Sequence, residues 1–224
     1  HAELVGRGHA CSVNFVAQVM REAGIAAKTR RKFRQTTDSN HSMPVAENVL
    51  DREFDPEEPN TRWCADITYI PTREGWLYLA VVEDLFSRRI VGWSMDKTMT
   101  SRLVVDALEM ALARRLSLRG SSSSGLVAHS DRGSQYCAHE YRRLMDQFKM
   151  RPSMSRKGDC YDNAPMESFW GTLKNELVHH SRYKTREQAI REITEYIEVF
   201  YNRQRRQARL GYLSPTVYER QFYA

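Results

Sequence analysis

The sequence has few cysteines and no long run of apolar residues. Its four cysteines, Cys11, Cys64, Cys137 and Cys160, form neither a Cys-x-x-Cys pair nor a regular framework, which argues against a disulfide-stapled secreted domain and favours a reducing, cytoplasmic setting. No stretch approaches the roughly 18 apolar residues of a membrane-spanning helix, and no secretory signal is visible. The seven histidines do not combine with the cysteines at zinc-finger spacing, so no zinc site is predicted.

What the sequence does contain is an excess of positive charge. The 224 residues carry a formal net charge of +6, and 28% of them are charged. Lys and Arg gather at 28–34, 88–89, 114–115 and 203–206. Each basic cluster fits either a solvated face or a surface that binds phosphates, and charge alone leaves both possibilities open. The length favours one main domain with a small appended segment.

The apolar pattern predicts a short helix followed by a run of strands. Residues 12–23 have apolar positions at helical spacing behind Ser12, a candidate N-cap, and a polar linker is expected from there to about residue 43. Residues 61–70, 76–86 and 88–95 are rich in β-branched and aromatic residues. These three segments are expected to form consecutive antiparallel strands, with a turn at Glu74-Gly75.

The second half of the chain alternates between helices and short strands. Helices are predicted at 101–116, near 138–148, from Pro165 onward and after the capping box that begins at Thr185; strands are predicted at 126–131 and 151–155; a flexible loop is predicted at 120–125. The order is βββαβαβα plus a terminal helix. It predicts an α/β fold in which helices pack on a mixed five-stranded sheet.

Three acidic residues occupy positions where a sheet protein can bring distant side chains together. Asp66 falls within the first strand, Asp131 at the end of a later strand, and Glu167 at the start of a helix. Any one of them could be an ordinary turn or cap residue. With 28 acids in the chain, many sets of three would also occur at such spacings by chance. Gathered together, such carboxylates raise each other's pKa and stay ionised chiefly around a divalent cation. Metal-assisted chemistry on phosphate is the expected use.

Lys174 lies seven residues after Glu167, nearly two helical turns, so both side chains project from the same face. An acid that binds metal and a cation that contacts phosphate would then border one groove, although a solvated surface lysine is the alternative. The consecutive residues His129, Ser130 and Asp131 cannot converge on one substrate atom, which argues against a hydrolase triad.

The four tryptophans are predicted to pack in the core rather than to stack on bases, because each sits beside other apolar residues in a strand or helix pattern. They are Trp63, Trp76, Trp93 and Trp170.

Five segments carry a resemblance to a known family: TRWCADITYI, EGWLYLAVVEDLFSRRIVGW, HSDRGSQY, SMSRKGDCYDNAPMESFWGTLKNEL and YIEVFYNRQRRQARLGYLSP. Together they resemble the OrfB transposases of the insertion sequence 3 family, which are relatives of retroviral integrases. The motifs run in order over almost everything from about 60 to 217. Residues 12–60, with MREAGI and TTDSNH, resemble the segment that joins an upstream helix-turn-helix region to the catalytic core in that family.

The resemblance implies a ribonuclease H-like fold with Asp66, Asp131 and Glu167 as the catalytic, metal-binding DDE triad. They would hold two Mg²⁺ ions, for which Mn²⁺ would substitute; one ion would activate water or a DNA 3′-hydroxyl and the other would stabilise the leaving oxygen. Lys174 matches a family position that contacts DNA near the active site. Further candidate DNA contacts are Arg156, Lys157, Asn163, Arg203, Arg205 and Arg206.

The implied function is cleavage of transposon-end DNA and transfer of the freed strand. A ribonuclease H-like nuclease that only hydrolyses, or an inactive DNA-binding derivative, remain alternatives. The predicted organisation is a helical, basic N-terminal segment and linker at 1–58, the remnant of an upstream DNA-binding region, followed by the catalytic core at 59–224. The first residue is His1 rather than Met, so a fragment or processed chain is expected.

The resemblance also implies partners and a location. The expected partners are transposon-end and target DNA, further copies of the chain in a homo-oligomer on DNA, and an upstream OrfA-type partner or fusion. No membrane association is expected. The expected location is the bacterial cytoplasm, with association to the nucleoid.

Two features depart from the family pattern. Gln207 stands where many relatives have His, and the loop at 120–125 is longer than usual. The loop at 156–163 is expected to be mobile without DNA, because Gly158 and its four charged residues give it little to bury.

Overall fold

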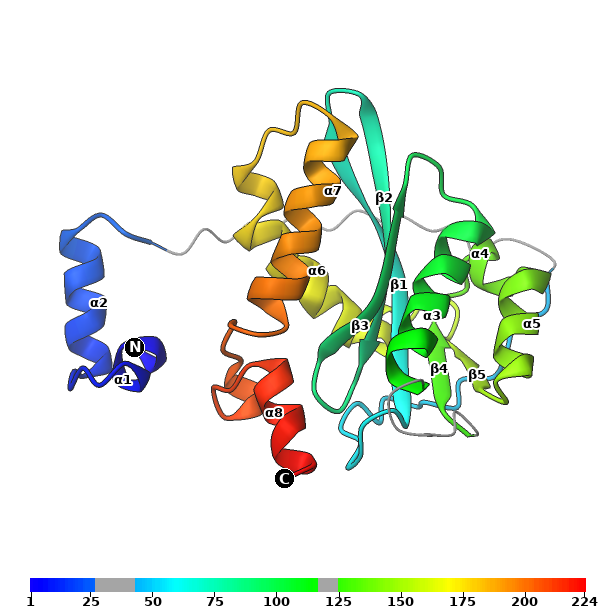
Figure 1. Ribbon diagram of the computed structural model, residues 1–224, viewed down its shortest axis with the longest axis horizontal. Coiled ribbons are helices and arrows are strands. Elements are labelled where there is room, and N and C mark those ends of the chain that lie inside the picture. Colours follow the sequence, from blue (N-terminus) through cyan, green and yellow to red (C-terminus); the bar gives the residue numbers. More distant parts are fainter. Residues whose placement is uncertain (27–42, 117–124) are drawn as a thin grey trace.

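A five-stranded mixed sheet organises the chain (Figure 1). In this computed structural model, residues 1–26, 43–116 and 125–224 are described. The strand order is β3-β2-β1-β4-β5; β1 pairs antiparallel with β2 and β2 with β3, whereas β4 pairs parallel with β1 and β5 with β4. The strands are β1 (Arg62–Thr72), β2 (Gly75–Asp84), β3 (Arg89–Asp96), β4 (Val127–Ser130) and β5 (Arg151–Met154). The predicted mixed sheet and its three antiparallel strands are confirmed.

Side chains of β1 alternate between two cores, one on each face of the sheet. Trp63, Ala65 and Ile67 belong to the first core, whereas Cys64 and Ile70 belong to the second. This period of two follows from the pleat of the strand. Asp66 therefore projects toward the second core.

Helices cover both faces of the sheet (Figure 1). The first face carries α3 (Ser101–Leu116), α4 (Ser134–Cys137) and α5 (His139–Gln147), and the second carries α6 (Ala164–Glu176), α7 (Arg186–Glu195) and the π-helix η3 (Tyr196–Tyr201). Gly92 allows the close approach of α3, since a Cβ there would lie 2.1 Å from the carbonyl oxygen of Ala107. The predicted order βββαβαβα is confirmed.

Short elements complete the described chain. They are α1 (Ala2–Gly6), α2 (Val13–Glu22), α8 (Pro215–Phe222), and the 3-10 turns η1 (Cys160–Asn163), η2 (Val178–His180) and η4 (Ala208–Leu210). The sequence pattern did not predict α1. Neither α1 nor α2 contains a buried residue in the part of the chain that the structure describes. No helix in that part is long and apolar enough to span a bilayer.

The predicted helix starts at Pro165 and Thr185 are confirmed. Pro165 lies in the first turn of α6, and the Thr185 hydroxyl accepts a hydrogen bond from Gln188 N at 3.1 Å. The linker predicted to extend to about residue 43 and the loop predicted at 120–125 fall almost entirely outside the described residues.

Exposed apolar residues include one of the four tryptophans that were predicted to pack in the core. Trp76 is 46% exposed and packs edge-on against Tyr69 at the end of the β1–β2 hairpin, so the prediction of a core role is wrong for this tryptophan. Ile190 and Phe200 are also exposed. Phe200 lies in η3, where the π-helical turn shifts the phase of the apolar stripe away from that of α7.

A buried ionic cluster fastens α8 to the sheet and to α3. Glu219 of α8 accepts hydrogen bonds from both terminal nitrogens of Arg115, with 2.9 Å between Nη2 and Oε2, and from Ser87 Oγ at 3.1 Å. Arg115 also donates to Asp84 at 2.7 Å, and Arg89 lies 3.4 Å from Glu219. Each acid of this cluster therefore has an arginine partner within the chain.

Candidate active site

Parallel pairing of β1 with β4 places two of the predicted acids side by side. Ala65 is in register with Ser130, so the next residues along the two strands are Asp66 and Asp131. By the alternation of the pleat, Asp131 projects toward the same face of the sheet as Asp66. That face is covered by α6, which carries the third acid, Glu167.

Hydrogen bonds hold the two aspartates. Asp66 Oδ1 accepts from the backbone nitrogen of Ile67, and its Oδ2 accepts from the indole Nε1 of Trp170, both at 2.8 Å. Asp131 Oδ1 accepts from the backbone nitrogen of Gly133 at 2.9 Å. Burial raises the pKa of Asp66 to about 7, and the charges of Asp131 and Glu167 add to this rise, while the Trp170 hydrogen bond opposes it.

One face of α6 carries the remaining residues of the site. Glu167, Trp170 and Lys174 are three and four residues apart, which is the spacing of neighbours on a helix surface. Burial raises the pKa of Glu167. The Lys174 ammonium lies 5.3 Å from the centre of the Tyr69 ring; burial lowers the pKa of Lys174, and the charge of Asp66 opposes that effect. Lys174 is therefore within electrostatic range of Asp66.

The donor chemistry of this site fits a hard divalent cation. Asp66 and Asp131 offer carboxylate oxygens, the ligands that Mg²⁺ prefers, and the raised pKa of Asp66 reflects a negative charge that a cation would offset. Among the described residues, however, no three His, Cys, Asp or Glu side chains form a ready metal-binding group.

Comparison with known proteins identifies the family. Residues 56–160 and 167–222 match the family described as Integrase core domain. The transposase InsF of insertion sequence IS3A from Escherichia coli K12 is 45% identical over 217 residues, which are 97% of this chain and 74% of that protein. The chain belongs to the IS3 family of transposases.

A second relative and two solved structures extend this result. A 31 kDa protein of insertion element IS600 from Shigella sonnei, described as uncharacterized, is 49% identical and covers 99% of this chain and 79% of its own length. The HTLV-2 integrase catalytic core domain, in complex with magnesium, has a TM-score of 0.54 at 18% identity and covers 73% of this chain and 98% of its own. A chain of the simian T-cell lymphotropic virus intasome in complex with PP2A regulatory subunit B56 gamma has a TM-score of 0.53 at 18% identity, and the match covers 89% of this chain and 68% of that chain. The transposase therefore has the ribonuclease H-like fold of integrases.

Of the predicted DNA contacts near the site, one is ion-paired within the chain and one is buried. Arg156 forms ion pairs with Asp51 and Asp162, and Asn163 is only 7% exposed. Lys157 is exposed. An exposed lysine suits a direct phosphate contact, whereas a contact through Arg156 requires Asp51 to release it and a contact through Asn163 requires the start of α6 to open.

The basic cluster at 203–206 also contains both ion-paired and exposed arginines. Arg205 pairs with Glu176 at 2.8 Å, and Arg206 pairs with Glu3 of α1 at 2.6 Å. Arg203 is exposed. Of the three arginines, Arg203 is the best placed for a direct phosphate contact.

Sequence reasoning missed the role of Trp170. Its ring packs in the core as predicted, with 7% exposure, but its nitrogen binds Asp66. The signal available in the sequence was its position three residues after Glu167, on the same helix face.

The premise for a mobile loop at 156–163 is wrong for Asp162. This carboxylate is fully buried and ion-paired, so the loop does bury a charged group. Mobility of the loop without DNA stays a prediction.

Proposed function

We propose that the chain nicks transposon-end DNA and joins the freed 3′-hydroxyl to a phosphodiester, with Asp66, Asp131 and Glu167 as the catalytic, metal-binding residues. The observation that carries this proposal is the pairing of Asp66 with Asp131 on adjacent parallel strands, where each lacks an arginine partner among the described contacts. Acids so placed favour a cation from outside the chain.

Each residue of the site has a role in this proposal. Trp170 holds one oxygen of Asp66, leaving the carboxylate in a fixed orientation. Lys174 lies beside Tyr69 and near Asp66, so its ammonium can neutralise a phosphate that enters next to the acids. Glu167 approaches from α6 and completes the acidic set. The bound metal would supply activation of the attacking oxygen and stabilisation of the leaving oxygen.

The finer details of the metal belong to the same proposal. Two Mg²⁺ ions, replaceable by Mn²⁺, would be held by the three acids, and zinc would not be required. Support comes from the carboxylate-only donor set, which suits hard cations, and from the structurally similar HTLV-2 integrase core domain in complex with magnesium.

DNA is the proposed partner, both as transposon ends and as target. A homo-oligomer on DNA is supported by the structural likeness to a chain of a viral intasome and to an integrase core domain solved in a trimeric form. Residues 1–58 are proposed as a helical, basic N-terminal segment and linker, the remnant of an upstream DNA-binding region, with an OrfA-type partner or fusion upstream. The proposed setting is the bacterial cytoplasm with association to the nucleoid.

The test is a joining assay with pre-cut transposon-end DNA, a target plasmid and Mg²⁺ or Mn²⁺. Wild-type protein should give joined product, and Glu167→Gln should lower the yield on the order of 10³-fold. The matched control is Glu187→Gln, at an exposed position on α7, which should leave joining unchanged. Cleavage without joining would favour the hydrolytic nuclease, and DNA binding without either reaction would favour the inactive derivative; both outcomes would reject the proposal.

A further inference from the structure

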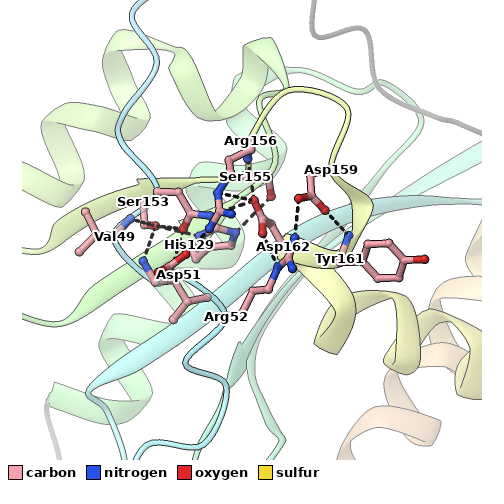
Figure 2. A network of polar contacts seen from close by, with 12 residues as sticks. Val49, Asp51, Arg52, His129, Ser153, Ser155, Arg156, Asp159, Tyr161 and Asp162 are labelled. Carbon is pink, nitrogen blue, oxygen red and sulfur yellow. Dashed lines mark hydrogen bonds and ion pairs between the residues drawn. The ribbon is translucent and has the colours of Figure 1, made fainter.

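Residues 48–52, which we term the strap, lie against the sheet edge and the loop that leads into α6 (Figure 2). The backbone nitrogens of Val49 and Leu50 donate to Ser153 Oγ of β5 at 2.9 and 3.0 Å. The Leu50 side chain is fully buried in the core that α6 shares. The strap is therefore attached to the catalytic fold, although it precedes residue 56, where the Integrase core domain match begins.

The buried carboxylate of Asp162 joins the strap to the loop (Figure 2). Its Oδ1 accepts from Arg52 Nε at 2.8 Å, and its Oδ2 accepts from Asn48 Nδ2 and from the backbone nitrogen of Arg156, both at 2.9 Å. Asp162 is fully buried. Although burial acts to raise the pKa of Asp162, these hydrogen bonds keep it below its usual value. The carboxylate thus depends on donors from both segments.

Asp162 lies at the start of the catalytic helix. It belongs to η1, which runs directly into α6, and Glu167 is in the first turn of α6. Asn163 is the N-cap of α6, but within the described residues its side chain makes no capping hydrogen bond. The start of α6 is therefore held by the contacts of Asp162 in place of a side-chain cap.

The strap also reaches the strand that leads to Asp131. Ser153 Oγ, which accepts from the strap, lies 2.8 Å from His129 Nδ1, and His129 Nε2 lies 3.1 Å from Ser155 Oγ. His129 is in β4, two residues before Asp131. The same short segment is thus connected by hydrogen bonds to the elements that carry Asp131 and Glu167.

The backbone of the strap is held in an unfavourable conformation. Asp51 and Arg52 have φ angles of 40° and 64°, in the left-handed region that L-residues rarely adopt. Two such residues in succession persist only where contacts fix them. The Arg52 pairs with Asp162 and Asp159 and the Asp51 pair with Arg156 are those contacts.

We propose that Asn48 and Arg52 are positioning residues of the active site, which hold Asp162 and through it the first turn of α6, so that Glu167 can meet Asp66 and Asp131 around the metal. This inference rests on the proposed function for the role of the three acids. The strap contacts no reacting atom. It fixes the position of the first turn of α6 and therefore that of Glu167 relative to Asp66 and Asp131.

The experiment compares Arg52→Gln and Asn48→Ala in the full chain. Both positions are partly exposed, so the variants should fold, whereas replacing the buried Asp162 endangers folding. The matched control is Arg102→Gln, which removes an exposed arginine on α3 paired with Asp106. Arg52→Lys keeps the charge and should restore part of any loss.

The first measurement is hydrogen exchange of backbone amides, which needs neither metal nor DNA. Arg52→Gln and Asn48→Ala should speed exchange over residues 156–168 and leave β1 to β3 unchanged, whereas Arg102→Gln should leave 156–168 unchanged. Unchanged exchange over 156–168, or faster exchange throughout the sheet, would overturn the inference.

The second measurement is joining as a function of Mg²⁺ concentration at saturating DNA. Arg52→Gln should lower the maximal rate about tenfold and raise the Mg²⁺ concentration for half-maximal rate, as expected of a misplaced ligand. A normal rate and a normal Mg²⁺ dependence would overturn the inference even if exchange increased. Failure of the wild-type protein to join DNA would instead reject the proposed function, while the exchange measurement would still test the strap.

Discussion

Asp66 and Glu219 are both carboxylates packed against the sheet, but the charged side chains around them are of opposite sign. Glu219 is bound by Arg115 and Arg89, and these charges, with the hydrogen bond from Ser87, outweigh burial and lower its pKa. Asp66 has the acids Asp131 and Glu167 as charged neighbours, so burial, reinforced by their charges, raises its pKa to about 7. The negative charge of Glu219 is therefore neutralised by arginines of the same chain, whereas that of Asp66 is not.

The difference separates a structural use of charge from a functional one. Arginine partners make the Glu219 cluster a fastening for α8, because a buried acid stays ionised when it is paired. The Asp66 site gives up that stability, since protonation or a cation from solution, and not an arginine of the chain, would relieve its repulsion. A concentration of unfavourable charge of this kind is typical of sites that act on ligands.

The sharpest test of this comparison is the pH dependence of stability for Asp66→Asn in EDTA. The folded-state pKa of Asp66 is raised from 3.8 to about 7, so the wild type loses stability as pH rises through that window and does not regain it above pH 7. Asn cannot ionise, so the variant should gain stability relative to wild type from pH 4 to 7, by roughly 4 kcal/mol at most. Denaturant unfolding at several pH values measures this, and a difference that does not grow with pH would break the comparison.

Glu219→Gln should show the opposite dependence. The lowered pKa of Glu219 means that its contribution is fully present above about pH 4.5 and is lost as pH falls through the folded-state value. At pH 7 the variant should lose about 3 kcal/mol of unfolding free energy, because Arg115 is left buried with one partner fewer. The deficit should shrink below pH 4.5. Glu57→Gln, at an exposed position, is the control and should change little.

The smallest expected effect concerns the hydrogen bond between Trp170 and Asp66. Trp170→Phe should cost about 1 kcal/mol more stability than Trp63→Phe, because both remove the same ring atoms but only Trp170 loses a hydrogen bond. Trp63 Nε1 is buried and has no hydrogen-bond partner among the described residues. Equal losses in thermal or denaturant unfolding for the two variants would show that the hydrogen bond from Trp170 to Asp66 contributes nothing measurable to stability.

Much of the fold could be predicted because its signals are local. The strand at 61–70 shows in its β-branched and aromatic residues, and the helix at 186–195 in the Thr185 cap. Trp76 and Phe200 could not be placed from pattern alone, because exposure depends on tertiary packing and on where a helix widens to π-helical turns. The partners of Arg156 and Arg205 were hidden for the same reason, since they are supplied by segments far away in the sequence.

The family, the order of strands and helices, and three acids with a lysine seven residues after the last of them could be read from the sequence alone. These features follow from residue identity and spacing, which are present before the chain folds. The contacts of Trp170 with Asp66, of Arg115 with Glu219, and of Asn48 and Arg52 with Asp162 became visible only in the folded molecule. These contacts join residues about 100 positions apart, and no local pattern encodes which distant side chain will meet a buried charge.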